Sequence, residues 1–187
     1  AGSLARDIES GTLERLKLSR MGSFDLLFGT LIPWSVLAIV QVVILFGVAL
    51  LIGFSWTGGI TSLILAVLVS VIAGVASVSL GLLIAAFADT EQHASNLGTL
   101  IAVPLSFFVG VFFPFPKVPI GKLVGSTFEI YDFLPWSHAS DALRSLLVFG
   151  EGAKDITIDI AFLVFLTVLL FFIGVYFFSR TRLSARE

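Results

Sequence analysis

The sequence predicts an all-α membrane protein, with a single membrane domain over residues 1–187 and four transmembrane helices. Composition supports this class, because 57% of the residues are hydrophobic and only 13% are charged, whereas soluble domains are about 45–50% apolar and about 25% charged. The mean hydropathy is correspondingly high, at +1.06. Residues 26–88 also carry no charge, which leaves room for two helices of about 20 apolar residues, the length that crosses a bilayer.

Four apolar segments meet or approach the length of a transmembrane helix. Pro33 lies near the start of the first segment, where it predicts a kink. A glycine-rich turn with an interfacial Trp56 separates the first segment from the second. The third segment is shorter and contains Pro104. The predicted spans are 24–54, 60–88, 97–113 and 156–178.

Basic residues gather at both ends of the chain. They occur in the segment 1–23 before the first span and in the segment 179–187 after the last. Flanking segments rich in Lys and Arg usually lie in the cytoplasm, and four spans place both termini on the same side. We therefore predict a multi-pass protein of the plasma membrane with both termini of this chain cytoplasmic and residues 114–155 outside.

Small residues recur along one face of the second span, at intervals of three or four. Such a face allows the backbone of another helix to approach closely, although apolar spans are in any case rich in Gly and Ala. The spacing fits packing within the chain or a contact between subunits, and it does not distinguish them. The residues are Ser70, Gly74, Ser77, Gly81 and Ala85.

Residues 119–150 contain two apolar pieces that are each too short to span a bilayer, joined by a Leu-Pro-Trp sequence that includes Pro135. Apolar pieces of about 10–14 residues are typical of re-entrant or interfacial helices. We therefore predict a short re-entrant helical hairpin that enters the membrane from outside, before the last span. An external loop lying on the membrane is the alternative.

Three polar residues in this hairpin follow one another at intervals of three, so we place His138, Asp141 and Arg144 on one helix face. A histidine and an aspartate near a membrane raise the question of a hydrolase or a proton relay. No second histidine or carboxylate cluster completes a metal site, and the serines beside His138 do not form a nucleophile elbow. We therefore predict no catalytic residue and no metal site, and we rank a channel or substrate contact above catalysis.

The N-terminal segment 1–23 alternates apolar and charged residues, which is typical of a short amphipathic helix at the membrane surface. Such a segment either anchors in the lipid headgroups or presents a docking face to a cytoplasmic partner. Its charges are of both signs, whereas binding to anionic lipid favours an excess of Lys and Arg. Docking is therefore somewhat favoured.

Three stretches, in order along the chain, carry a resemblance to a known family. They are RDIESGTLERLKLSR at 6–20, GLLIAAFADTEQHASNLGTLIAVPLSFFVGVFFP at 81–114 and LPWSHASDALRSLLVFGE at 134–151. In the ABC-2 type permeases, the integral membrane subunits of many ABC exporters, they resemble the G-T-L-E coupling segment, the G-L-L-I-A stretch with the F-F-P run that follows it, and the L-P…A-L-R-x-L-L piece before the last span. Each motif is mostly apolar and weak alone, but their order along nearly the whole chain is fairly specific.

The resemblance implies a partner and an architecture. In that family the G-T-L-E segment lies on the cytoplasmic side and contacts a nucleotide-binding ATPase subunit, and permeases work as dimers with the substrate path between the halves. The family normally has six spans, two of them before this segment, so the chain resembles its C-terminal two-thirds. The residues carried over as coupling candidates are Glu9, Gly11, Thr12, Leu13, Glu14 and Leu16.

The sequence contains no P-loop, the G-x-x-x-x-G-K-[ST] motif that binds ATP. Its Gly121-Lys122 pair is followed by Leu123. We therefore expect no cofactor in this chain, with Mg-ATP in the partner subunit. The expected function is the membrane-spanning permease of an ATP-driven exporter, with a second permease half and the lipid bilayer as further partners and no nucleic acid. The alternative is a non-transporting oligomeric scaffold or accessory membrane protein, and an intramembrane enzyme ranks third.

Overall fold

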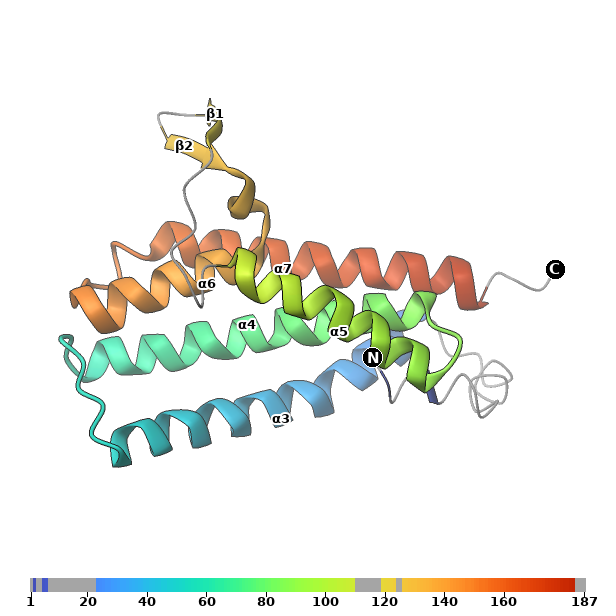
Figure 1. Cartoon of the computed structure of the whole chain (residues 1–187), viewed down its shortest axis with the longest axis horizontal. Coiled ribbons are helices and arrows are strands. Elements are labelled where there is room, and N and C mark those ends of the chain that lie inside the picture. Colours follow the sequence, from blue (N-terminus) through green and yellow to red (C-terminus); the bar gives the residue numbers. More distant parts are fainter. Residues whose placement is uncertain (1, 3–4, 7–22, 110–118, 124–125, 184–187) are drawn as a thin grey trace.

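The computed structural model of the chain describes residues 2, 5–6, 23–109, 119–123 and 126–183, and the structural statements below concern these residues. The long helices lie side by side and form a bundle (Figure 1). The described N-terminal residues and the end of the last long helix lie at the same end of this bundle (Figure 1).

Three helices in the described part of the chain are long and apolar enough to cross a membrane, judged by length and composition. A helix of 28 residues, such as the second of them, is about 42 Å long, which exceeds the hydrocarbon core of about 30 Å. They are α3 (Ser23–Leu51), α4 (Ile60–Phe87) and α7 (Thr157–Phe178), at the positions of the first, second and fourth predicted spans. The protein is therefore a multi-pass membrane protein.

The turn between α3 and α4 explains why one long apolar stretch becomes two helices. α3 continues through Pro33. Gly53 then takes a left-handed backbone conformation, with φ of +91°, which glycine adopts without steric cost. The indole Nε1 of Trp56 donates a hydrogen bond to the carbonyl of Gly59, at 3.2 Å, directly before α4 begins.

The predicted span at 97–113 is not confirmed. The helix found there, α5 (Glu91–Phe108), begins six residues earlier, where the side chain of Thr90 accepts a hydrogen bond from the backbone N–H of His93. Its first two turns are polar. The apolar part from Leu97 to Phe108 is about 18 Å long, which is too short to cross a bilayer. The end of the predicted span, 110–113, lies outside the described residues.

The first arm of the predicted helical hairpin is not helical. β1 (Pro119–Leu123) pairs with β2 (Ser126–Glu129) in an antiparallel ribbon, and the 3-10 helix η1 (Ile130–Phe133) follows. Proline, glycine and β-branched residues recur in this sequence, and they are poor helix formers. The ribbon projects from the helices (Figure 1). The hairpin as predicted is therefore not confirmed, and this ribbon departs from the predicted all-α class.

The second arm is helical, as predicted. α6 (Pro135–Arg144) starts with a proline in its first turn, where the missing N–H costs nothing. It continues as the π-helix η2 (Ser145–Phe149), which stops at Gly150 with a left-handed φ of +69°. A second short π-helix, η3 (Ser179–Leu183), extends the end of α7.

α5 and α6 together carry the chain along the bundle in two shorter helices. We call one end of the bundle the Glu91 end, where α5 begins, and the other the Thr57 end, where the α3–α4 turn lies (Figure 1). The C-terminal part of α5 and the start of α6 line the same cavity, described below. At the far end of η2, the hydroxyl of Thr57 donates a hydrogen bond to the carbonyl of Val148, at 2.8 Å. The chain thus passes from one end to the other although α5 alone is too short.

α4 is the central helix of the bundle, and it packs against α3, α6 and α7. Two apolar cores hold it in place. Near the Glu91 end, α4 and α7 bury Leu82, Ala85, Ala86, Phe171 and Phe178. Nearer the Thr57 end, α4, α6 and α7 bury Ala66, Val69, Ala139, Ala142, Leu146, Ile156 and Leu163.

Candidate functional site

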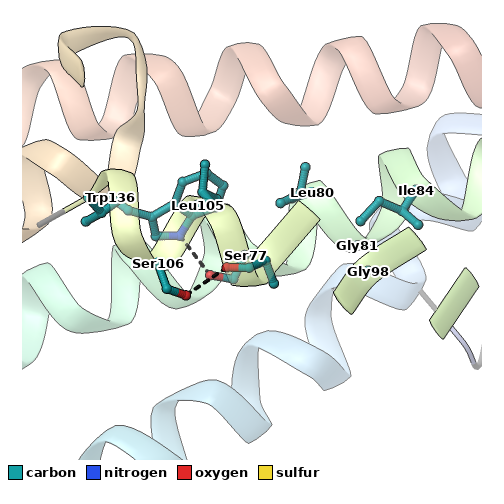
Figure 2. Close-up of a pocket in the computed structure, with 10 residues that line it drawn as sticks. Ser77, Leu80, Gly81, Ile84, Gly98, Leu105, Ser106 and Trp136 are labelled. Carbon is teal, nitrogen blue, oxygen red and sulfur yellow. Dashed lines mark hydrogen bonds between the residues drawn. The ribbon is translucent and has the colours of Figure 1, made fainter. Parts of the chain in front are cut away.

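A cavity of about 370 Å³ lies between α4, α5 and the start of α6 (Figure 2). It begins about halfway along α4, since Ser77 lies about 26 Å from the first residue of that helix at 1.5 Å per residue. Three elements distant in sequence therefore line one space. The lining residues are Ser77, Leu80, Gly81, Ile84, Gly98, Ala102, Leu105, Ser106, Val109 and Trp136.

Small residues are the reason that this space stays open. Gly81 on α4 and Gly98 and Ala102 on α5 present little or no side chain to one another. A Cβ atom added at Gly98 would meet no atom within 4 Å. Protein interiors are otherwise close-packed, so a gap of this size between two helices is a specific feature of the chain.

The predicted small-residue face of α4 divides into packed and open positions. At Gly74, an added Cβ would lie 3.0 Å from the Cβ of Ala38, so α3 approaches closely there. Ala85 is fully buried in the core against α7. Ser70 turns its hydroxyl to its own helix and donates to the carbonyl of Ala66. Intramolecular packing thus uses part of this face, and a contact between subunits stays a prediction.

The two remaining residues of that face line cavities on both of its sides. Ser77 and Gly81 border the cavity already described and also a second one of about 390 Å³ between α3 and α4. From α3, the second cavity is lined by Thr30, Trp34, Leu37, Ala38 and Gln41. Two cavities therefore flank the middle of α4.

The polar groups of the first cavity are hydrogen-bonded within the protein. Trp136 donates from Nε1 to the hydroxyl of Ser77, at 2.9 Å (Figure 2). That hydroxyl donates in turn to the carbonyl of Ala73, at 3.0 Å, and Ser106 donates to the carbonyl of Ala102, at 2.7 Å. Among the described residues, no charged side chain lines the cavity. The chemistry favoured is contact with an uncharged, largely apolar body, and the lining holds no nucleophile–base pair for covalent chemistry.

His138 lies on α6 in a buried polar contact near the Thr57 end. Its Nδ1 is 3.0 Å from Oδ1 of Asp159 on α7, and its Nε2 is 3.0 Å from the carbonyl oxygen of Asp132 in η1. Its ring stacks on Phe162, with the centroids 5.1 Å apart and an interplanar angle of 12°. Only 8% of the residue is exposed. One side chain therefore joins η1, α6 and α7.

The surroundings of His138 favour its charged form. Burial lowers the pKa of His138, but the hydrogen bonds to Asp159 and to the Asp132 carbonyl, with the negative charges of both residues, outweigh it. The pKa therefore lies above its usual value of 6.5.

The other residues of the predicted polar face are placed differently. Asp141 and Arg144 are exposed, whereas His138 is buried. The grouping of all three on one face was wrong, because a helix turns by about 100° per residue and residues six positions apart lie about 120° apart around the axis. Pro135 is buried at the start of α6, where it helps to aim Trp136 at α4. The structure brings neither exposed residue to the cavity lining.

Sequence reasoning missed Asp159. The signal was present, because Asp159 is the charged residue within the otherwise uncharged stretch 156–178. An ionisable side chain at the end of an apolar helix normally has a partner or a function. The six coupling candidates, in contrast, fall within 7–22 and lie outside the described residues.

Comparison with known proteins agrees with the three motifs. The model of the ABC-2 type transporter family matches residues 1–148, well over half of the chain. The chain belongs to the ABC-2 type transporter family. The family resemblance predicted from the sequence is thereby confirmed, and the chain is a transmembrane part of an ABC transporter.

Two curated relatives are similar over much of the chain. Nodulation protein J of Rhizobium leguminosarum bv. trifolii is 29% identical over 119 residues, which cover 64% of this chain and 43% of that protein. ABC transporter G family member 20 of Dictyostelium discoideum is 28% identical over 174 residues, 91% of this chain and 22% of that protein. The chain thus spans less than half the length of these relatives. No solved structure matches the chain.

Proposed function

We propose that this chain is part of the membrane-spanning permease of an ATP-driven ABC exporter, and that the cavity between α4, α5 and α6 belongs to its substrate path. The cavity carries this proposal, because side chains leave a space unfilled between three elements in the middle of the bundle, whereas protein interiors are otherwise close-packed. Membership of the ABC-2 family supplies the transporter class. A second permease half would complete the path.

ATP would act from outside this chain. A separate nucleotide-binding subunit would bind Mg-ATP and engage the coupling residues of 9–16, and its closure would move the helices as rigid bodies. We place the protein in the plasma membrane, with the Glu91 end of the bundle facing the cytoplasm. Support for this orientation comes from the basic residues that precede α3 and follow α7 in the sequence, and from the start of α3 and the end of α7, which lie at the same end of the bundle (Figure 1).

Purification of the complete protein from its own membranes tests the proposal. We expect a P-loop ATPase to co-purify in a stoichiometric complex, whereas a non-transporting scaffold would be isolated without one. In the complex, Glu14→Arg is expected to reduce export by about fivefold or more at unchanged ATP hydrolysis. Glu151→Arg reverses the same kind of charge on an exposed residue at the Thr57 end and serves as the matched control. Unchanged export by Glu14→Arg would contradict the proposed coupling.

A further inference from the structure

An ion pair joins the N-terminal segment to the start of α5. Arg6 donates from Nε to Oε2 of Glu91, at 2.7 Å, and from Nη2 to Oε1, at 2.9 Å. Two N–H donors of the planar guanidinium thus meet both oxygens of one carboxylate, which fixes the direction as well as the distance of the contact. The two residues are 85 positions apart in sequence. The pair therefore joins the N-terminal segment directly to the first residue of α5.

This pair contributes little to the stability of the fold. The side chains of Arg6 and Glu91 are 70% and 42% exposed, and solvent screens exposed ion pairs, so they contribute little to stability. Its geometry is nevertheless bidentate, which adds geometric specificity to the contact between the two elements. These properties fit a pair that passes a movement of the N-terminal segment to α5 better than a pair that holds the bundle together.

An apolar contact lies directly beside the ion pair. Ala5 is fully buried against Ala88 and Ala94, with Leu97 packed alongside. This cluster is separate from the two cores that join α4 to α6 and α7. The first turns of α5 are thus held by residues 5–6 and by the link from α4.

Beyond its first turns, α5 lies across the cavity from α4. The helices face each other across the cavity, with Gly98 and Ala102 on one side and Ser77 and Gly81 on the other. A movement of the attached end of α5 would therefore change the width of the cavity without breaking a packed core. Figure 1 shows α5 running obliquely across α4 from the Glu91 end.

We propose that Arg6 and Glu91 are positioning residues that pass the movement of the coupling segment to α5 and so to the cavity. Arg6 precedes Glu9, the first coupling candidate, by three residues. The inference rests on the proposed function, because it takes an ATPase acting on residues 9–16 as the source of movement. It adds the path within the chain by which that movement reaches the substrate.

Charge reversal in the complete transporter, with its ATPase subunit, tests the link. Spin labels are placed on α4 and α5 through Leu68→Cys and Leu100→Cys, two exposed positions in a chain without cysteine. We expect the distance between the labels to change when the ATPase is trapped with ATP and vanadate. Arg6→Glu and Glu91→Arg alone should each reduce the population that responds by about fivefold or more, and the double exchange should restore it. Glu151→Arg is the matched control and should leave the response unchanged.

The outcomes distinguish a failure of this inference from a failure of the proposed function. An unaltered response in both single variants, or a double exchange that does not restore a lost response, overturns the inference alone. A parent complex that hydrolyses ATP without any change between α4 and α5 also overturns it, since the cavity then does not follow the ATPase. Absence of an ATPase from the purified complex overturns the proposed function, and the inference with it. A structural role of the pair would instead lower the yield of the folded complex, and gel filtration of every variant measures this separately.

Discussion

The imidazole of His138 and the carboxylate of Asp159 meet at 3.0 Å between α6 and α7, while the other ring nitrogen of His138 lies 3.0 Å from the carbonyl oxygen of Asp132. Both partners are acceptors. A neutral imidazole has one N–H and satisfies only one of them, whereas the protonated ring donates to both. The geometry and the raised pKa therefore point to the same charged species.

The stability of the protein should consequently depend on the protonation of His138. Its pKa in the folded protein lies above the ordinary 6.5, so the contribution is complete below about pH 6.5 and is lost as the pH rises through the folded pKa. The groups that face the ring are Asp159 on α7 and Asp132 on η1, and α4 carries no charged residue. Thermal unfolding in detergent between about pH 6 and pH 9 should show the parent losing stability as the pH rises, because the hydrogen bonds of the charged ring are worth about 1.5–3 kcal/mol each.

Two variants separate this effect from general alkaline destabilisation. His138→Gln should be less stable than the parent at the lower pH and should approach it at the higher one. His93→Gln, which replaces the other histidine at an exposed position of α5, should keep the pH dependence of the parent. A parent-like pH dependence in His138→Gln would show that His138 is not the titrating group.

Much of the helical arrangement was predictable because it depends on uninterrupted apolar length. α3, α4 and α7 lie where the sequence places spans, since nothing in those stretches except a turn at Gly53 breaks the helical pattern. The predicted third span is not confirmed: the hydrophobic run starts at Leu97, whereas the helix starts after a cap at Thr90. The cap at Thr90 and the start of the apolar run at Leu97 are thus seven residues apart, and the prediction rested on the run alone.

The candidate site was less accessible to sequence reasoning than the spans were. Ser77 and Gly81 were found by their spacing, but the same spacing served packing at Gly74 and Ala85. Whether a small residue closes or opens a contact depends on the side chain opposite it. That partner is set by the tertiary position of α5, which periodicity within α4 does not encode.

Filling the cavity should block the substrate path without unfolding the protein. Gly98→Leu adds a side chain where no atom lies within 4 Å of the new Cβ, and replacing a glycine within a helix is favourable by up to about 1 kcal/mol. We expect export by the complete transporter to fall by about tenfold while ATPase assembly persists, since a loss of about 1.4 kcal/mol of productive binding suffices. Photolabelling with a neutral aromatic diazirine should map to α4 and α5 in the parent and disappear in the variant.

Gly47→Leu provides the matched control for this substitution. Gly47 is also a helical glycine with no atom within 4 Å of an added Cβ, but it lies on α3 and does not line the cavity. Its export and labelling should remain at the level of the parent. Equal losses in both variants would mean that the bulk of the new side chain, and not its position in the cavity, impairs the transporter.

The hydrogen bond from Trp136 to Ser77 should fix the start of α6 against the middle of α4. Trp136→Phe removes the donor and keeps an aromatic ring, and Ser77→Ala removes the acceptor together with the bond to the Ala73 carbonyl. Each change should lower the free energy of unfolding by about 0.5–1.5 kcal/mol. The double variant should lose less than the sum, because the second change has no remaining partner to remove. Denaturant titration of all four proteins measures this coupling. Strictly additive losses would show that the two side chains do not stabilise each other across the cavity.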